Sequence, residues 1–214
     1  MDVPRPLSRR IAVLISGRGS NLQAILDAIR AGELDATVAL VISNRPEAPG
    51  LMRAREAAVE AVCLKPRDYA DRDSYDVAVV QTLRARDVGL VCLAGFMRLV
   101  GPPLLQAFPN RIVNIHPSLL PSFPGLEAQR QALEHGARIT GATVHLVNAD
   151  LDAGPIVLQA AVPVLDDDRV ETLSARILIE EHKLYPQAIQ TVLDGDWMIE
   201  GRRFVRGGRR TGQN

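Results

Sequence analysis

The sequence predicts an α/β protein with a Rossmann-like, doubly wound and mostly parallel twisted sheet that carries helices on both faces. Two observations lead to this fold class. Short apolar runs such as residues 11–16 and 88–94 are continuous, as is typical of parallel strands buried on both faces. They alternate along the chain with segments whose apolar residues have helical spacing, which favours a parallel sheet with crossover helices.

Length and composition narrow the class of protein further. The 214 residues carry 25 Lys and Arg against 25 Asp and Glu, so no global positive field predicts nucleic acid or a membrane surface as a partner. Cys63 and Cys92 lie in apolar runs without metal-ligand spacing, which favours free thiols in a reducing compartment. No apolar run reaches membrane-spanning length and no secretory signal is recognisable. We expect a soluble, cytoplasmic protein.

The chain is expected to contain one domain. Residues 1–9 hold two prolines and two arginines and are predicted to be a flexible leader. Residues 10–200 form the predicted catalytic domain, because no linker or internal repeat interrupts them. Residues 201–214 are rich in arginine and glycine and are predicted to be a flexible tail.

In the first half of the chain, the strand at residues 11–16 ends in G-R-G-S-N. Leu22, Ile25 and Ile29 then share one face of a predicted helix. The remaining elements of this half are strands at residues 37–43, 62–64 and 88–94 and helices at residues 49–59 and 71–86.

The second half opens with a strand that ends at Pro117, which has no N–H group for a sheet. One long helix is predicted near the end of the chain, and Pro186 is expected to kink or break it. The remaining elements are a helix at residues 127–135, strands at 139–147 and 156–164, and that long helix at 170–193.

Asn114 and His116 are candidate catalytic residues. They lie two residues apart at the carboxyl end of the strand before Pro117, so their side chains share one face. Open α/β sheets place their sites at such strand ends, and an imidazole titrates near neutral pH. The alternative is that both side chains satisfy local backbone groups at a turn.

The G-R-G-S-N segment, residues 17–21, is a candidate phosphate site. It joins a buried strand to a helix, and free N–H groups at a helix N-terminus bind anions. A dinucleotide site fits poorly, because Leu22 stands where the third glycine is required and no acid follows the second strand. The alternative is a tight turn without a ligand.

Asp150 and Asp152 lie in the loop after residue 147. Loop carboxylates are often solvated, but a loop folded over the strand end would bring a carboxylate to His116 and raise the pKa of the imidazole. His145 alternates with apolar residues and is a further candidate, whereas His135 and His182 are expected at the surface. No metal-ligand cluster and no nucleophile elbow is recognisable, so we expect direct transfer without a covalent enzyme intermediate.

Several motifs occur in order between about Ile11 and Gly195, and together they resemble the glycinamide ribonucleotide (GAR) formyltransferases, which are folate-dependent. The motifs are G-R-G-S-N-L-Q-A-I, L-A-G-F-M-R, N-I-H-P-S-L-L-P-S-F-P-G, T-V-H and L-D-A-G-P-I-V-L-Q. The resemblance implies transfer of a formyl group from the co-substrate 10-formyltetrahydrofolate to the amino group of GAR in purine biosynthesis. It implies no metal, and a monomer or homodimer.

The resemblance also implies a role for each matching residue. The catalytic set would be Asn114, His116 and Asp152. The phosphate and ribose of GAR would contact Gly19, Ser20, Asn21 and Glu181. Folate would lie against Arg72, Met97, Arg98, Leu99, Val100 and Asp150. The chain departs from the usual family pattern at Arg18, Glu127 and Gln129, which puts details of the substrate contacts in question.

The N-I-H-P-S-L-L-P motif also resembles methionyl-tRNA formyltransferase and formyltetrahydrofolate deformylase. The first carries an extra C-terminal tRNA-binding domain and the second an N-terminal regulatory domain, and we expect neither here. A catalytically inactive binding protein would be expected to lack Asn114, His116 or Asp152, whereas this sequence has all three.

Overall fold

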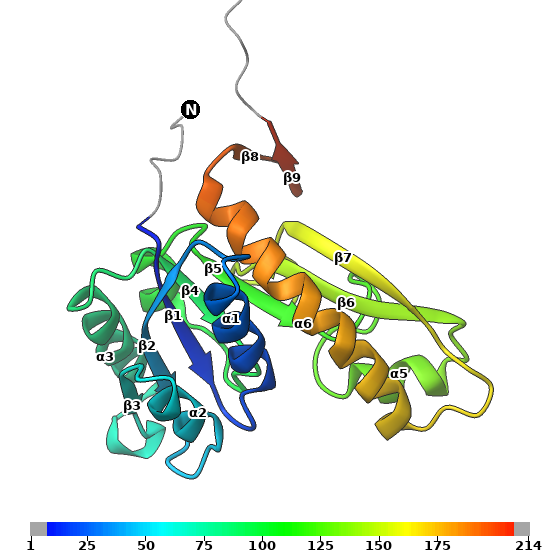
Figure 1. Cartoon of the computed structure of the whole chain (residues 1–214), viewed down its shortest axis with the longest axis horizontal. Coiled ribbons are helices and arrows are strands. Elements are labelled where there is room, and N and C mark those ends of the chain that lie inside the picture. Colours follow the sequence, from blue (N-terminus) through cyan, green and yellow to red (C-terminus); the bar gives the residue numbers. More distant parts are fainter. Residues whose placement is uncertain (1–7, 208–214) are drawn as a thin grey trace, which may run out of the picture.

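The computed structural model describes residues 8–207, so most of the predicted leader and the end of the predicted tail lie outside it. Within this range nine strands form one sheet in the order β3-β2-β1-β4-β5-β6-β7-β9-β8 (Figure 1). This sheet, whose strands alternate with helices along the chain, confirms the predicted α/β fold.

The first five strands of the sheet run parallel to one another. They are β1 (Arg10–Ile15), β2 (Thr37–Ser43), β3 (Ala61–Cys63), β4 (Leu90–Leu93) and β5 (Ile112–His116). β6 (Ile139–Leu146) is antiparallel to β5, and β7 (Ile156–Pro163) is antiparallel to β6. The sheet is therefore doubly wound in its parallel half and extended by a hairpin at one side.

Helices cover both faces of the sheet, as predicted. α1 (Ser20–Arg30) and α6 (Val170–Asp194) pack side by side on one face (Figure 1). α3 (Arg72–Arg84) and α4 (Pro102–Ala107) pack together, and their apolar residues join the core of the other face. The shorter helices are α2 (Gly50–Glu56), α5 (Ala128–Glu134) and a 3₁₀ turn at Pro66–Asp68.

β1 shows why its sequence is apolar throughout. Val13 and Ile15 belong to the core under α1 and α6, whereas Ala12 and Leu14 belong to the core under α3. Successive side chains of a strand point to opposite faces, so a strand covered on both faces needs apolar residues at every position.

Pro186 was predicted to kink or break the last helix, and the predicted break is wrong. α6 runs without interruption from Val170 to Asp194 with Pro186 inside it. Pro186 is buried, and its neighbour Tyr185 donates its hydroxyl to the carbonyl oxygens of Leu93 and Val113 at 2.9 and 3.2 Å. Packing against the sheet therefore outweighs the hydrogen bond that proline removes from the helix.

The prediction of a flexible tail from residue 201 is wrong for its first part. β8 (Trp197–Glu200) and β9 (Arg203–Arg206) form a hairpin, and β9 pairs with β7 where Ile156 faces Arg203. Trp197 is buried, stacks on Phe204 at 4.9 Å between ring centroids, and donates its Nε1–H to the Val192 carbonyl. This aromatic pair fixes the hairpin to the end of α6.

The arrangement of β1 and β4 positions the sites. They are neighbours in the sheet, although the chain runs outward from them in opposite directions. Residues 17–19 follow β1 and residues 94–101 follow β4, and the two loops are joined by the Ser16 hydroxyl, which accepts the Met97 N–H at 2.8 Å. Ligands of open α/β sheets bind at such a point.

Candidate active site

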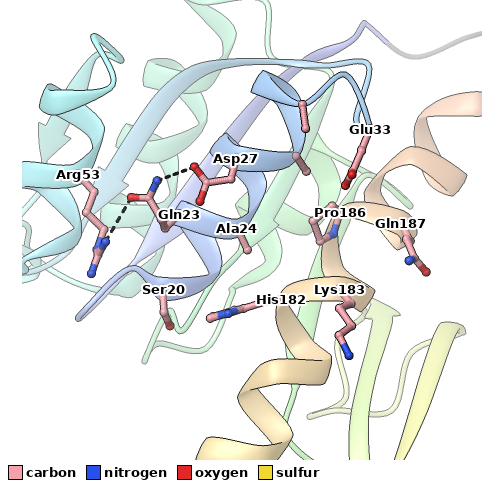
Figure 2. Close-up of a pocket in the computed structure, with 12 residues that line it drawn as sticks. Ser20, Gln23, Ala24, Asp27, Glu33, Arg53, His182, Lys183, Pro186 and Gln187 are labelled. Carbon is pink, nitrogen blue, oxygen red and sulfur yellow. Dashed lines mark hydrogen bonds between the residues drawn. The ribbon is translucent and has the colours of Figure 1, made fainter.

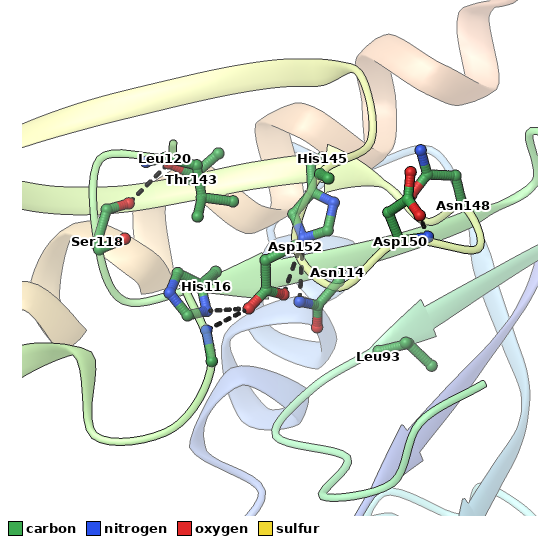
Figure 3. A network of polar contacts seen from close by, with 12 residues as sticks. Leu93, Asn114, His116, Ser118, Leu120, Thr143, His145, Asn148, Asp150 and Asp152 are labelled. Atoms are coloured by element: carbon green, nitrogen blue, oxygen red, sulfur yellow. Dashed lines mark hydrogen bonds and ion pairs between the residues drawn. The ribbon is translucent and has the colours of Figure 1, made fainter. Parts of the chain in front are cut away.

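Asn114, His116 and Asp152 come together at the end of β5 (Figure 3). The Asp152 carboxylate arrives from the loop after β6, and its Oδ2 lies 3.4 Å from His116 Nδ1. The side chains of His116 and Asp152 are only 6% and 9% exposed. The structure therefore joins the carboxylate and imidazole that the sequence placed far apart in the chain.

The loop after β5 supplies two backbone groups that the sequence did not point to. His116 Nε2 lies 2.8 Å from the Phe123 carbonyl oxygen, so this nitrogen carries a proton and donates it. The Gly125 N–H donates to Asp152 Oδ2 at 2.8 Å. Both partners of the ion pair are thereby oriented by the same loop.

His145 completes the network from β6. It lies opposite Asn114 in the register of β5 and β6, and its Nε2 is 3.2 Å from Asn114 Nδ2 and 3.6 Å from Asp152 Oδ1. Its Nδ1 faces the Leu146 carbonyl at 3.0 Å and therefore donates. The contact of Nε2 with the Asn114 side chain fixes the direction of that amide.

Asp152 acts to raise the pKa of His116, as expected from the sequence, but the overall shift has the opposite direction. Burial lowers the pKa of His116 below its ordinary value of 6.5, and this outweighs the opposite influence of the Phe123 carbonyl and of Asp152. Burial also acts to raise the pKa of Asp152, but hydrogen bonds from His145 and Gly125 and the charges of nearby histidines lower it overall. Both shifts act in the same sense: they favour an ionised Asp152 and make His116 harder to protonate than a free imidazole.

The candidate phosphate turn lies at the N-terminus of α1, with Gly19 at the capping position and a φ of 71°. A side chain at Gly19 would place its Cβ 2.7 Å from the Gly50 Cα. The Gly50 N–H also donates to the Gly17 carbonyl at 3.1 Å. The start of α2 thus holds the turn in a shape that leaves the first N–H groups of α1 free.

Asn21 and Glu181 connect α1 to α6. Asn21 Nδ2 donates to Glu181 Oε2 at 2.7 Å, and Asn21 Oδ1 is buried without a hydrogen-bond partner among the described residues. Burial raises the pKa of Glu181, and the Asn21 bond partly offsets this. An acceptor and a carboxylate in this position can receive hydrogen bonds from hydroxyl groups.

A cavity of about 650 Å³ joins the phosphate turn to the segment after β4. All four predicted GAR-contacting residues, Gly19, Ser20, Asn21 and Glu181, line it together with Met97. Arg18 and Gln129, where the sequence departs from the family pattern, also line it, as do Glu171 and Ser174, which the sequence did not single out.

The predicted folate residues lie on one helix, α3, and in two loops, after β4 and after β6. Met97 and Leu99 are each 59% exposed. Two further apolar residues, Leu126 and Leu151, lie near the Gly125–Asp152 contact and are 77% and 58% exposed. These exposed apolar side chains are available to contact a ligand. The polar members are dispersed: Arg72 begins α3, Arg98 lies over the Tyr75 ring, and Asp150 is exposed beside Asn148.

A second groove, of about 640 Å³, lies between α1 and α6 on the other side of Ser20 (Figure 2). His182, expected at the surface, lines it; its Nε2 is buried without a partner among the described residues, and burial lowers its pKa. Within residues 8–207 no cluster of three His, Cys, Asp or Glu side chains could hold a metal ion. No helix there is long and apolar enough to cross a membrane.

Known proteins resemble this chain along most of its length. The chain is 44% identical over 185 residues to the phosphoribosylglycinamide formyltransferase of Escherichia coli, which covers 86% of this chain and 87% of that protein. The crystal structure of glycinamide ribonucleotide transformylase 1 from Symbiobacterium toebii superposes with a TM-score of 0.91 at 60% identity, over 92% of this chain and 93% of the other.

The chain is also 47% identical over 193 residues to the trifunctional purine biosynthetic protein adenosine-3 of Drosophila melanogaster. That match covers 89% of this chain but only 14% of the length of the fly protein. Residues 9–189 match the formyl transferase family. With the network of Asn114, His116 and Asp152 in place, the chain belongs to the formyl transferase family.

Proposed function

We propose that the protein transfers the formyl group of 10-formyltetrahydrofolate to the amino group of GAR, giving formyl-GAR and tetrahydrofolate in purine biosynthesis. The observation that carries the proposal is the convergence of an amide, an imidazole and a carboxylate at the end of β5. A free helix N-terminus suited to a phosphate lies two strands away, at the end of β1.

In the proposed reaction the GAR amine attacks the formyl carbon directly. A C–N bond forms, the carbonyl oxygen becomes an oxyanion, and the bond to the folate nitrogen then breaks. Asn114 donates a hydrogen bond to the oxyanion through its amide, whose direction His145 fixes. Preorganised donors of this kind stabilise the charge that develops in acyl transfer.

His116 and Asp152 are assigned the transfer of the proton from the attacking amine to the departing folate nitrogen. With Nε2–H held by Phe123, the unprotonated Nδ1 of His116 faces the Asp152 carboxylate. The pair is arranged to take the proton that leaves the attacking amine, directly or through a water. The resulting imidazolium stabilises the oxyanion and returns the proton to the departing folate nitrogen.

The proposed substrate contacts lie mainly in the two neighbouring loops that follow β1 and β4. Gly19, Ser20 and Asn21 bind the GAR phosphate, and Glu181 binds its ribose. Met97 to Val100 and Arg72 hold the folate, and the exposed Leu126 and Leu151 cover its flat ring system. Asp150 contributes to the folate site from the loop after β6. A cytoplasmic location and a monomer or homodimer are part of the same proposal.

One assay tests the proposed function against hydrolysis. Purified protein is given 10-formyltetrahydrofolate with a labelled formyl group, once with GAR and once with water as the only acceptor. Label is expected in formyl-GAR, with little formate formed when GAR is absent. Release of formate at the same rate with or without GAR would mean that the protein is a deformylase.

A further inference from the structure

Asp76 is a buried carboxylate beneath the segment that is proposed to hold folate. It lies on α3 and is 3% exposed. Its Oδ2 accepts the backbone N–H of Gly101 at 2.6 Å. Gly101 follows residues 97–100 directly and caps the N-terminus of α4. A charged acceptor on α3 therefore fixes the end of the folate segment, and hydrogen bonds to charged groups are stronger than neutral ones.

Two guanidinium groups lie beside this carboxylate. Burial raises the pKa of Asp76, and the Gly101 N–H and the charges of Arg72 and Arg98 partly offset this. Arg98 lies 4.8 Å from the centre of the Tyr75 ring, and its Nε is buried without a hydrogen-bond partner among the described residues. The charges of both arginines therefore act on Asp76, although the ion pair of Arg72 is with Asp73, at 4.0 Å.

The close approach of α3 and residues 97–101 depends on the absence of a side chain at Gly101. A Cβ at this position would lie 2.6 Å from Asp76 Oδ2 and 3.2 Å from Arg72 Nε. An alanine at this position would therefore force the Asp76 carboxylate, and with it the Arg72 side chain, out of the observed arrangement. The same contact places Arg72 and Gly101 next to each other, so the start of α3 and the end of the segment form one unit.

We infer that Asp76 is a positioning residue for the folate co-substrate, which it serves by joining residues 97–101 to the start of α3. The inference rests on the proposed function, because it concerns the folate site of the same reaction. The GAR contacts lie on α1 and α6 and do not involve α3. Loss of Asp76 is therefore expected to weaken folate binding and to leave GAR binding unchanged.

The test compares wild type, Asp76→Asn and Asp76→Ala. Calorimetry gives the Kd of tetrahydrofolate and of GAR, and steady-state assays give KM for 10-formyltetrahydrofolate and kcat. Asp76→Ala is expected to raise the folate Kd and KM by about tenfold, with kcat and the GAR Kd within about twofold. Asp76→Asn should have a smaller effect, because its amide oxygen still accepts from Gly101, and it carries the test if the alanine variant does not fold.

Asp168→Asn is the matched control. The Asp168 side chain is 1% exposed and pairs with Arg176 at 2.7 Å, outside the proposed folate site. Its loss is expected to lower stability without changing the folate Kd. Equal weakening of tetrahydrofolate and GAR by the Asp76 variants, or no change in either Kd, would overturn the inference. A wild-type protein that does not bind tetrahydrofolate would overturn the proposed function and this inference with it.

Discussion

His116 faces an acceptor with each of its ring nitrogens, the Phe123 carbonyl at Nε2 and the Asp152 carboxylate at Nδ1. Only the doubly protonated ring can donate to both, yet burial lowers its pKa. In the free protein the second ring proton of His116 is therefore disfavoured, and the reaction can supply it from the attacking amine. This balance depends on the loop fold and on burial, neither of which the local sequence around His116 reveals.

Asp152→Asn tests the coupling at the level of one residue. The negative charge of Asp152 raises the pKa of His116, so its removal is expected to lower that pKa further and to reduce turnover with little change in substrate affinity. An NMR titration of the His116 ring in wild type and variant measures the shift. An unchanged pKa would mean that Asp152 does not act on the imidazole.

Ser20→Ala tests the proposed phosphate turn. Gly19→Val, the obvious choice from sequence alone, would not be selective, because its side chain would collide with the backbone of Gly50. Ser20 lines the cavity, and alanine at this position removes only the hydroxyl group. Calorimetry is expected to show GAR affinity lowered by roughly tenfold or more, since bonds to charged groups contribute about 1.5–3 kcal/mol. Folate affinity should not change; a parallel loss would indicate a structural role.

The motifs predicted the residues whose side chains were assigned to the chemistry, but not the groups that orient them. Asn114, His116 and Asp152 could be named from sequence, and the structure brings them together. Phe123 and Gly125 act through backbone atoms, which leave no side-chain signal. The same is true of the Gly101 N–H that binds Asp76.

At the scale of the elements, most helices and strands were predictable, including the short β3, α2 and α5, whereas α4, β8 and β9 were missed. β2 has the predicted bounds, β5 ends just before Pro117 as predicted, and α1 was recognised from its apolar spacing. α4 has six residues, too few for a hydrophobic period, although a proline pair after Gly101 is a recognised helix start. Buried packing decided the outcome at Pro186, which sequence rules treat as a helix breaker.

Trp197→Ala tests the unexpected β8–β9 hairpin. Trp197 is 6% exposed and joins the hairpin to α6 through Phe204 and Val192. Truncation of a buried tryptophan commonly costs about 3–5 kcal/mol, so urea unfolding is expected to show a free energy of unfolding lowered by about 3 kcal/mol. Arg203→Ala, an exposed change in the same hairpin, is the control. A loss below about 0.5 kcal/mol for Trp197→Ala would mean that the hairpin does not stabilise the domain.

The switch point between β1 and β4 organises the whole molecule. It places the phosphate turn and the folate segment next to each other, and β5 brings the catalytic candidates to the neighbouring strand end. The order of the parallel strands follows from general rules for crossover connections. The antiparallel extension by β6 and β7 brings His145 and the Asp152 loop to the site, and it follows from no such rule.

Buried histidines predict how stability depends on pH. The pKa values of His116 and His182 are lowered below 6.5 by burial, so near that pH the unfolded chain binds protons that the folded protein does not. The free energy of unfolding is therefore expected to fall as the pH decreases from about 7.5 to about 6. The pKa values of Asp76 and Glu181 are raised above 3.8 and 4.5. Just above those pH values the folded protein binds more protons than the unfolded chain, so these two groups make the free energy of unfolding rise as the pH decreases.

Urea unfolding at the two pH values measures this dependence, and His182→Gln is the informative variant. Its loss of stability between pH 7.5 and 6 should be smaller than that of wild type, since one of the two linked histidines is gone. Stability that is constant or rises on acidification would show that the rings are not protected from protonation.

The most direct test of the proposed mechanism is a single-turnover measurement of formyl transfer with wild type and Asn114→Ala. With enzyme in excess and both substrates bound, the account predicts formation of formyl-GAR by wild type. The variant should react about 10²–10³ times more slowly, because an oxyanion donor has been removed. Equal rates for the two proteins would contradict the account.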